Sequence, residues 1–200
     1  MALAITRTLG STGIPVWQGL DKDIQLVQGG FALVTTGLTA GALLQAGSLV
    51  IYDEAARTAV VYSNGSLQAA ATGSPTTYRL NKGSGFKVGD YIAFAGTGGA
   101  AYAITAIDPA NTAYDLITVG TTIGNGSVGA GVYASTATGA TASAYPAANG
   151  LLYDDTLANP GESISVVIRG TIYARRMPGG YNAGIAALTG LSKIIFSQSK

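Results

Sequence analysis

Short apolar runs rich in Val, Ile, Thr and Tyr recur along this 200-residue chain, each bounded by Gly, Asn, Asp or Pro. Such residues favour strands and their flanking residues favour turns, so the pattern is typical of an all-β protein. Helices should be scarce, with residues 183–188 as a candidate for one or two helical turns, weakened by Gly184 and Gly190. We expect strands over residues 31–35, 48–52, 59–62, 77–80, 91–95, 101–107, 116–119, 131–134, 163–173 and 193–197.

Asn-Gly pairs mark expected turns, because both residues tolerate the positive φ of a tight hairpin. Asn64-Gly65 lies between two apolar runs and predicts a hairpin there, and Asn125-Gly126 and Asn149-Gly150 offer the same chemistry. Asp108-Pro109-Ala110-Asn111 suits a type I turn after the strand that ends at residue 107. The chain therefore reads as a series of hairpins.

Stretches of small, turn-rich residues near 69–75 and 134–148 divide the chain and read as linkers. We predict a mainly β fold in which an outer β-sandwich or β-tulip-like domain carries an inserted small β-barrel, since insertion at exposed points is commonly tolerated. The expected units are an extended N-terminal arm at 1–22, the first part of the outer domain at 23–72, the barrel at 73–134, a linker at 135–148 and the second part of the outer domain at 149–200.

The chain lacks the side chains that do most protein chemistry. It contains no histidine or cysteine, and 10% of its residues are charged, against roughly 25% in a typical soluble domain. Disulfides and thiolate metal sites are therefore excluded, and we expect no cofactor. A net charge of +1, with only Arg175 and Arg176 as adjacent cations, argues against nucleic-acid binding. Sparse charge also indicates a surface covered by copies of the chain or by a larger partner.

Targeting signals are not evident in the sequence. The first seven residues are too mixed for a secretory signal, so we expect synthesis in the cytoplasm. The uncharged stretch 24–52 is interrupted by Gln and Gly, which breaks the apolar run of about 20 residues that a membrane-spanning helix needs. No membrane insertion is expected.

Paired carboxylates raise the question of acid–base catalysis. Asp53-Glu54 and Asp154-Asp155 are neighbours in sequence, and neighbours on a strand point to opposite faces, so we interpret both pairs as turn residues. A serine nucleophile would have no histidine as base. The glycine segments 83–85 and 96–99 read as hairpin loops and not as phosphate loops. We therefore expect that the protein is not an enzyme. A hydrolase would have to use Asp90, Asp108 and Asp115 as its catalytic carboxylates, and their spacing in the sequence does not suggest a shared site.

Several segments together resemble the head fiber family of tailed bacteriophages and, more loosely, the β-rich proteins that decorate phage capsids as trimers. The resemblance implies a non-enzymatic virion protein on the outer capsid surface, with the major capsid protein and itself, as a homotrimer, for partners. No heptad repeat or long shaft is visible, so a compact knob is expected. The segments are Leu44-Gln45-Ala46-Gly47-Ser48-Leu49-Val50-Ile51-Tyr52-Asp53, Gly85-Phe86-Lys87-Val88-Gly89-Asp90, Ile104-Thr105-Ala106-Ile107-Asp108 with Tyr114-Asp115-Leu116-Ile117-Thr118-Val119, and Val166-Val167-Ile168-Arg169-Gly170-Thr171-Ile172-Tyr173.

This resemblance assigns candidate contacts to particular residues. Arg7, Trp17 and Lys22 are the candidates for docking the arm on a capsid, although a lone aromatic residue such as Trp17, the only tryptophan, usually packs back on its own domain. Tyr173, Tyr181 and Phe196 are the candidates for a trimer interface, although a terminal strand paired within its own domain explains the apolar tail 194–196 equally well.

A receptor- or glycan-binding module is the alternative function. The inserted barrel would face outward, and its loops at Ser84, Gly98 and Asn111 would carry specificity for a host-surface glycan.

Overall fold

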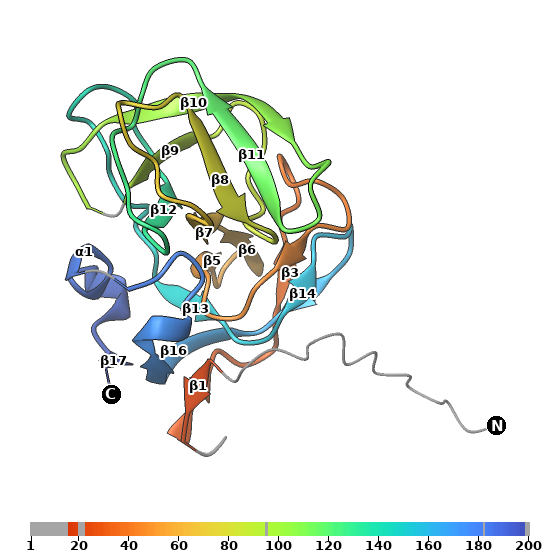
Figure 1. The fold of residues 1–200 in the computed structure, drawn as a ribbon. Helices are drawn as coiled ribbons and strands as arrows, with labels where there is room; N and C mark the ends of the chain where they lie inside the picture. The colour runs from red at the N-terminus through yellow and green to blue at the C-terminus, as the bar shows by residue number, and fades with distance from the viewer. Residues whose placement is uncertain (1–15, 20–22, 95, 182, 199–200) are drawn as a thin grey trace.

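The protein is mainly β, as its sequence predicts, and a sandwich and barrel description fits it (Figure 1). A computed structural model describes residues 16–19, 23–94, 96–181 and 183–198. Its strands form a nine-stranded sheet, a six-stranded sheet and a two-stranded ribbon.

The nine-stranded sheet and the ribbon form one half of the molecule, which we call the sheet lobe. The sheet runs in the order β1-β16-β13-β5-β6-β3-β15, and β2 and β17 also pair with β16. Three short helical segments follow β16. The sheet strands are β1 (Trp17–Gln18), β2 (Gln25–Leu26), β3 (Phe31–Leu33), β5 (Leu49–Asp53), β6 (Thr58–Val61), β13 (Gly150–Leu152), β15 (Ser163–Ile164), β16 (Val166–Tyr173) and β17 (Ile194–Ser197); the ribbon is β4 (Leu43–Leu44) with β14 (Thr156–Leu157); the helical segments are η2 (Ala174–Arg176), α1 (Ala183–Ala186) and η3 (Thr189–Leu191).

The six-stranded sheet curls into the other half, which we call the barrel. Its order is β7-β12-β9-β10-β11-β8, and a bridge between Leu67 and Leu80 joins the two ends of that order. Its strands are β7 (Asn64–Ser66), β8 (Thr77–Asn81), β9 (Tyr91–Phe94), β10 (Ala101–Asp108), β11 (Tyr114–Val119) and β12 (Gly131–Ala134). Because β7 precedes residue 73, this sheet starts before the predicted insertion; the domain boundaries themselves stay a prediction.

Tyr78 organises the barrel interior. Its side chain is 1% exposed and packs with Leu80, Ile104 and other apolar residues. The hydroxyl accepts a hydrogen bond from the Ile123 backbone N–H at 3.0 Å and lies 2.7 Å from the carbonyl oxygen of Pro75. A buried tyrosine needs such partners for its hydroxyl, and here they tie the loop before β8 and the loop after β11 to the barrel core.

Two of the expected local structures are confirmed in detail. The Asp108 carboxylate accepts a hydrogen bond from the Ala110 backbone N–H at 2.9 Å, which forms the turn between β10 and β11. The predicted helical turn at 183–188 appears as α1. All the expected strand regions contain strands, with ends shifted by a few residues and with the region 163–173 divided into β15 and β16.

The hairpin predicted at Asn64-Gly65 is wrong. Both residues belong to β7, where Asn64 pairs with Tyr133 and Gly65 with Val132 of β12. The chain passes here from β6 of the sheet lobe to β7 of the barrel instead of turning back. Asn149 does not close a hairpin either, because its side-chain amide bonds both the N–H and the carbonyl of Tyr52 on β5, at 2.9 and 3.0 Å.

The two lobes meet where β12 packs against the turn that follows η2. A Cβ atom built on Gly131 would overlap the carbonyl oxygen of Gly179, so two backbones lie in direct contact at this point. Beside it, the Tyr133 hydroxyl donates to the Gly179 carbonyl at 2.6 Å and also contacts the Gly180 carbonyl. The Tyr133 ring is buried with sheet-lobe residues such as Leu49 and Ile172, although it stands on a barrel strand. We call this contact the lobe junction.

Gly131→Ala should destabilise the protein by about 3 kcal/mol or more, because the rigid backbone of Gly179 cannot move aside for the new methyl group. Gly120→Ala is the matched control: the nearest atom to its new Cβ is a Thr105 methyl at 3.7 Å, and the expected change is within about 0.5 kcal/mol. Urea unfolding followed by circular dichroism measures both. Equal effects of the two substitutions would contradict the close backbone contact.

Candidate interaction surfaces

The acidic residues singled out in the sequence hold local structure. The Asp53 carboxylate accepts from the backbone N–H groups of Ala55 and Ala56, which confirms the turn interpretation there. Asp155 differs, because its carboxylate accepts from the distant N–H of Ala46 at 2.8 Å. Within the described part of the chain, no group of three or more acidic, histidine or cysteine residues could hold a metal ion, and no helix is long and apolar enough to cross a membrane.

The three carboxylates that a hydrolase would have to use have separate partners. Asp90 lies 2.9 Å from the Lys87 ammonium and Asp115 lies 2.5 Å from that of Lys82. Asp108 forms the turn described above. Elsewhere, burial and then the nearby Glu54 carboxylate raise the pKa of the Tyr52 phenol above its ordinary value.

Trp17 packs on its own chain. It lies in β1, opposite Ile172 of β16, and its ring stacks on Tyr153 with centroids 6.3 Å apart. The indole N–H donates to the Tyr153 carbonyl oxygen at 2.7 Å. The sequence leaves open whether Trp17 docks on a partner or packs on its own domain, and this geometry favours packing on its own domain. Arg7 and Lys22, the other candidates for capsid docking, lie outside the described residues.

The three candidate residues for a trimer interface lie near the end of β16, a region that we call the terminal pole. They lie on two different faces of the sheet. Phe196 is opposite Ile172 in the register of β16 and β17, and its ring lies 5.4 Å from that of Tyr181. Phe196 packs against the sheet-lobe core, and Tyr181 packs on Phe196. Tyr173 is one residue further along β16, so it points to the opposite face, where the Arg176 guanidinium lies 4.4 Å above its ring.

The outward face of the terminal pole is apolar at its edge. β17 pairs with β16 alone among the described strands, so it is an edge strand of the described sheet. Ile195, in β17, is 65% exposed. It lies opposite Thr171 of β16 and therefore on the same face of the sheet as Tyr173. An exposed apolar edge strand is a ready template for pairing with another chain. Figure 1 shows β1, β16 and β17 together, on the side of the molecule away from β10.

The loops proposed for glycan specificity differ in exposure. Gly98 and Asn111 are exposed, whereas Ser84 is buried against β7, with its Cβ close to Gly65. Ser84 therefore belongs to the packing between strands and does not stand at a loop tip.

An apolar groove of about 680 Å³ opens between the barrel and the β4–β14 ribbon. Its lining includes the apolar residues Leu43, Val88 and Ile107 and the ion pair of Lys82 with Asp115. Val88 is 58% exposed. Sequence reasoning missed this groove, because its walls come from segments far apart in the chain.

No family model, curated protein or solved structure matches this chain. The resemblance to phage head fiber proteins therefore stays a prediction from the sequence, and the surfaces above must carry the functional argument.

Substitutions at Trp17 separate internal packing from a role in docking. Trp17→Phe retains a ring on Tyr153 but removes the indole N–H, and should lower the free energy of unfolding by about 1 kcal/mol. Trp17→Ala removes the ring as well and should cost about 3 kcal/mol. Urea unfolding followed by circular dichroism measures both. If both variants were as stable as the parent protein, Trp17 would be free for a partner and the internal interpretation would be wrong.

Proposed function

We propose that this protein is a non-enzymatic structural component of a tailed-phage virion, a head fiber or capsid decoration protein bound as a homotrimer to the outer capsid surface. It is made in the host cytoplasm and stabilises the capsid, mediates attachment to the host surface, or both. The resemblance of its β segments to head fiber proteins suggested this function.

The observation that carries the proposal is the two-ended layout of the chain. The strands nearest the two chain ends, β1 and β17, flank β16 at the terminal pole, and the strands β10 and β11 of the barrel lie at the other end (Figure 1). Such a layout lets one end bind a large surface while the other end projects from it. It suits a compact knob on a capsid.

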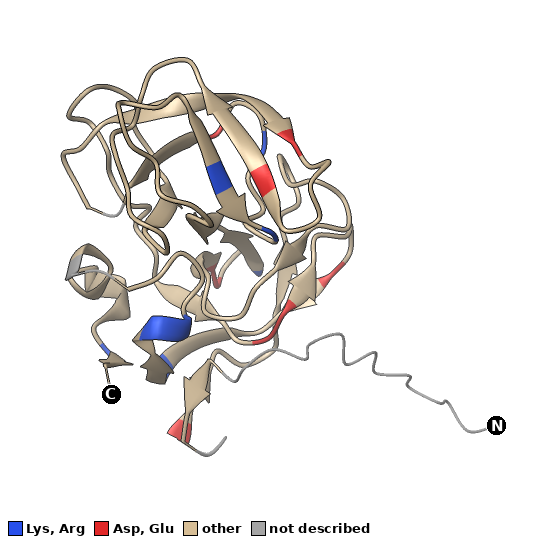
Figure 2. Cartoon of the chain, viewed as in Figure 1, with Lys and Arg blue, Asp and Glu red and all other residues tan. Residues whose placement is uncertain are grey.

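Surface chemistry supports the same proposal. Figure 2 shows few charged positions on the chain, and most of the cartoon carries none. Charged surfaces keep soluble monomers apart, so a surface this poor in charge suits a protein that is largely covered by other subunits. Three modest contacts on one rigid trimer would bind a capsid far more strongly than one contact.

The outward face of β17 around the exposed Ile195 is the part best suited to contacts between subunits. Ile195 and Tyr173 lie on the outward face, whereas Phe196 packs against the core and Tyr181 packs on Phe196. We therefore assign the trimer contact to the outward face of β16 and β17. We assign the capsid contact to the arm residues that precede Val16, because Trp17 packs within the sheet lobe.

A receptor- or glycan-binding module is the second candidate, favoured by the exposed barrel loops around Gly98 and Asn111. Sugar sites commonly offer an aromatic platform. Phe86 is the only aromatic residue that lines the apolar groove within the described structure, and it is buried. A glycan array decides between the candidates: binding of the purified protein to host-surface sugars would favour this second function.

Light scattering tests the trimer. The full chain should have a native mass of about 60 kDa, three times its 20.0 kDa chain mass. Ile195→Lys should shift it to the monomer, because a charge on an edge strand opposes pairing. Lys193→Met, which removes a charge at a neighbouring exposed position, is the control and should retain the trimer. A monomeric parent protein would contradict the proposal.

Capsid binding tests the rest of the proposal. A variant that lacks residues 1–15 keeps β1 and should keep its fold and its mass as a trimer. Co-sedimentation with purified capsids that lack the protein should show binding of the full chain and loss of binding by this variant. Retained binding would refute the role of the arm, and failure of the full chain to bind would refute the capsid function.

A further inference from the structure

A closed ring of three identical subunits needs two different surfaces on every subunit. Each copy in such a ring contacts one neighbour with the first surface and the other neighbour with the second, whereas a surface that meets a copy of itself closes a dimer. The outward face of β16 and β17 is one such surface of this chain. A trimer therefore requires a second surface that is complementary to this face.

The outward face presents an exposed isoleucine beside a cation. Ile195 is 65% exposed and lies opposite Thr171 of β16. Arg169 is also exposed, and it shares the face of Thr171 because it lies two residues before it on the same strand. Neither β16 nor β17 contains an acidic residue. A complementary surface should thus be apolar and should offer a negative charge.

The apolar groove between the barrel and the β4–β14 ribbon has the first of these properties. It encloses about 680 Å³, within the range of about 300–1,000 Å³ that is usual for pockets that take up a ligand. Phe86 and Ile117 line it with buried side chains, whereas the side chains of Leu43 and Val88, which also line it, are 37% and 58% exposed. Exposed apolar surface gathered in one place is typical of an interaction site.

Asp108 gives the groove the second property. It is exposed and lies between two residues that line the groove. Its carboxylate accepts a hydrogen bond from the Ala110 backbone N–H, and no cation pairs with it within the described structure. The groove therefore offers a carboxylate to Arg169 of another copy. A second outward face would oppose Arg169 with the same cation, which is unfavourable.

We propose that the apolar groove of each copy receives Ile195 of the next copy, so that the trimer is a head-to-tail ring. Ile195 is removed from water against Leu43 and Val88, and Arg169 lies toward Asp108. The occupant is a second copy because this chain carries both halves of the contact, an apolar residue beside a cation and an apolar groove beside a carboxylate. The inference rests on the homotrimer of the proposed function and adds the surfaces that its copies use.

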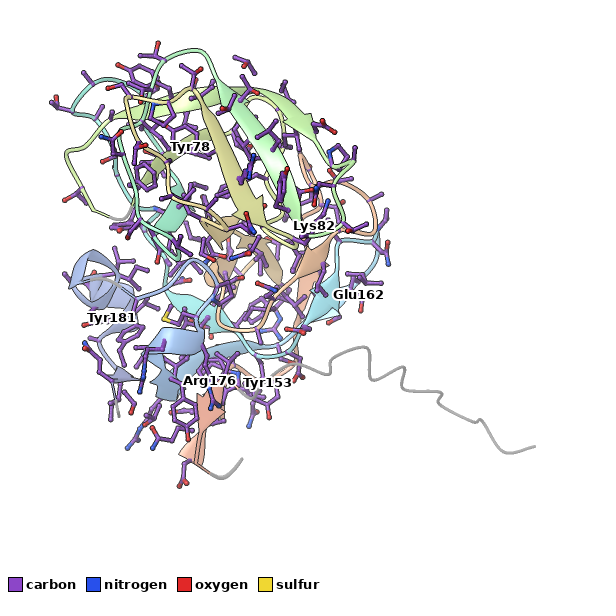
Figure 3. All side chains as sticks on the ribbon, in the orientation of Figure 1. Tyr78, Lys82, Tyr153, Glu162, Arg176 and Tyr181 are labelled. Carbon is purple, nitrogen blue, oxygen red and sulfur yellow. The ribbon has the colours of Figure 1, made fainter. Side chains whose placement is uncertain are left out.

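The two halves of this contact lie apart on one chain. Figure 3 labels Lys82, which lines the groove, and Tyr181, which packs on Phe196 of β17, and shows them well separated. The groove of one copy is therefore filled by Ile195 of a neighbour and not by its own. Each copy gives one side chain and receives one, and three such contacts close the ring.

Paired valine substitutions test the groove. Val88→Lys places a charge in the apolar contact and should reduce the native mass by light scattering from three times the 20.0 kDa chain mass to that of a single chain. Val128→Lys is the matched control: Val128 is 67% exposed and does not line the groove, so this variant should stay a trimer. A trimeric Val88→Lys variant would overturn the role of the groove. A monomeric parent protein would instead refute the homotrimer itself.

Cross-linking identifies the neighbouring surfaces directly, because the chain contains no cysteine of its own. A variant that carries both Ile195→Cys and Val88→Cys is treated with a short bis-maleimide reagent, which joins two thiols that lie close together. It should run as covalent dimers and trimers in denaturing electrophoresis. A variant that carries Ile195→Cys with Val128→Cys is the control and should run as single chains.

The cross-linking outcomes also separate this inference from the proposed function. Covalent dimers formed by Ile195→Cys alone would show that two copies of β17 meet each other, and would overturn the head-to-tail contact. If the Ile195→Cys and Val88→Cys variant had the native mass of a trimer but ran as single chains after treatment, the inference would fail and the homotrimer would stand.

Discussion

The close approach of Gly131 to Gly179 is the constraint on which the rest of the structure depends. The absence of a side chain on Gly131 lets the Gly179 carbonyl approach its backbone, and the Tyr133 hydroxyl fixes the same turn by donating to that carbonyl. β12 is thereby shared: its backbone pairs with β7 and β9 of the barrel, while Tyr133 is buried in the core of the sheet lobe. The two halves are joined by packing as well as by the chain, and we infer that they form one rigid unit.

A rigid unit gives the surfaces fixed positions relative to one another. The edge strand β17 and the exposed barrel loops belong to different lobes, and the lobe junction holds them apart. Lys82 lines the apolar groove and also a smaller pocket that includes Gly179 of the lobe junction. A partner bound at one end therefore sets the direction in which the other end projects, as a protein on the outside of a capsid requires.

Local sequence patterns predicted the strands well, because alternating apolar residues and turn residues act over a few positions. Asn64-Gly65 failed for a tertiary reason: pairing with β12 and burial of Asn64 outweighed the preference of this dipeptide for turns. Trp17 could not be assigned from sequence, since its partner Tyr153 lies far along the chain.

Native-state hydrogen exchange tests most directly whether the two lobes form one unit. The backbone amides to compare are those of Ile117 in the barrel and of Leu151 and Val167 in the sheet lobe, all of which lie in strands with buried side chains. If the junction makes the lobes one cooperative unit, these amides should exchange with the same free energy of opening, equal to that of global unfolding. A lower opening free energy for the barrel amides alone would show that the barrel unfolds separately and would contradict the account.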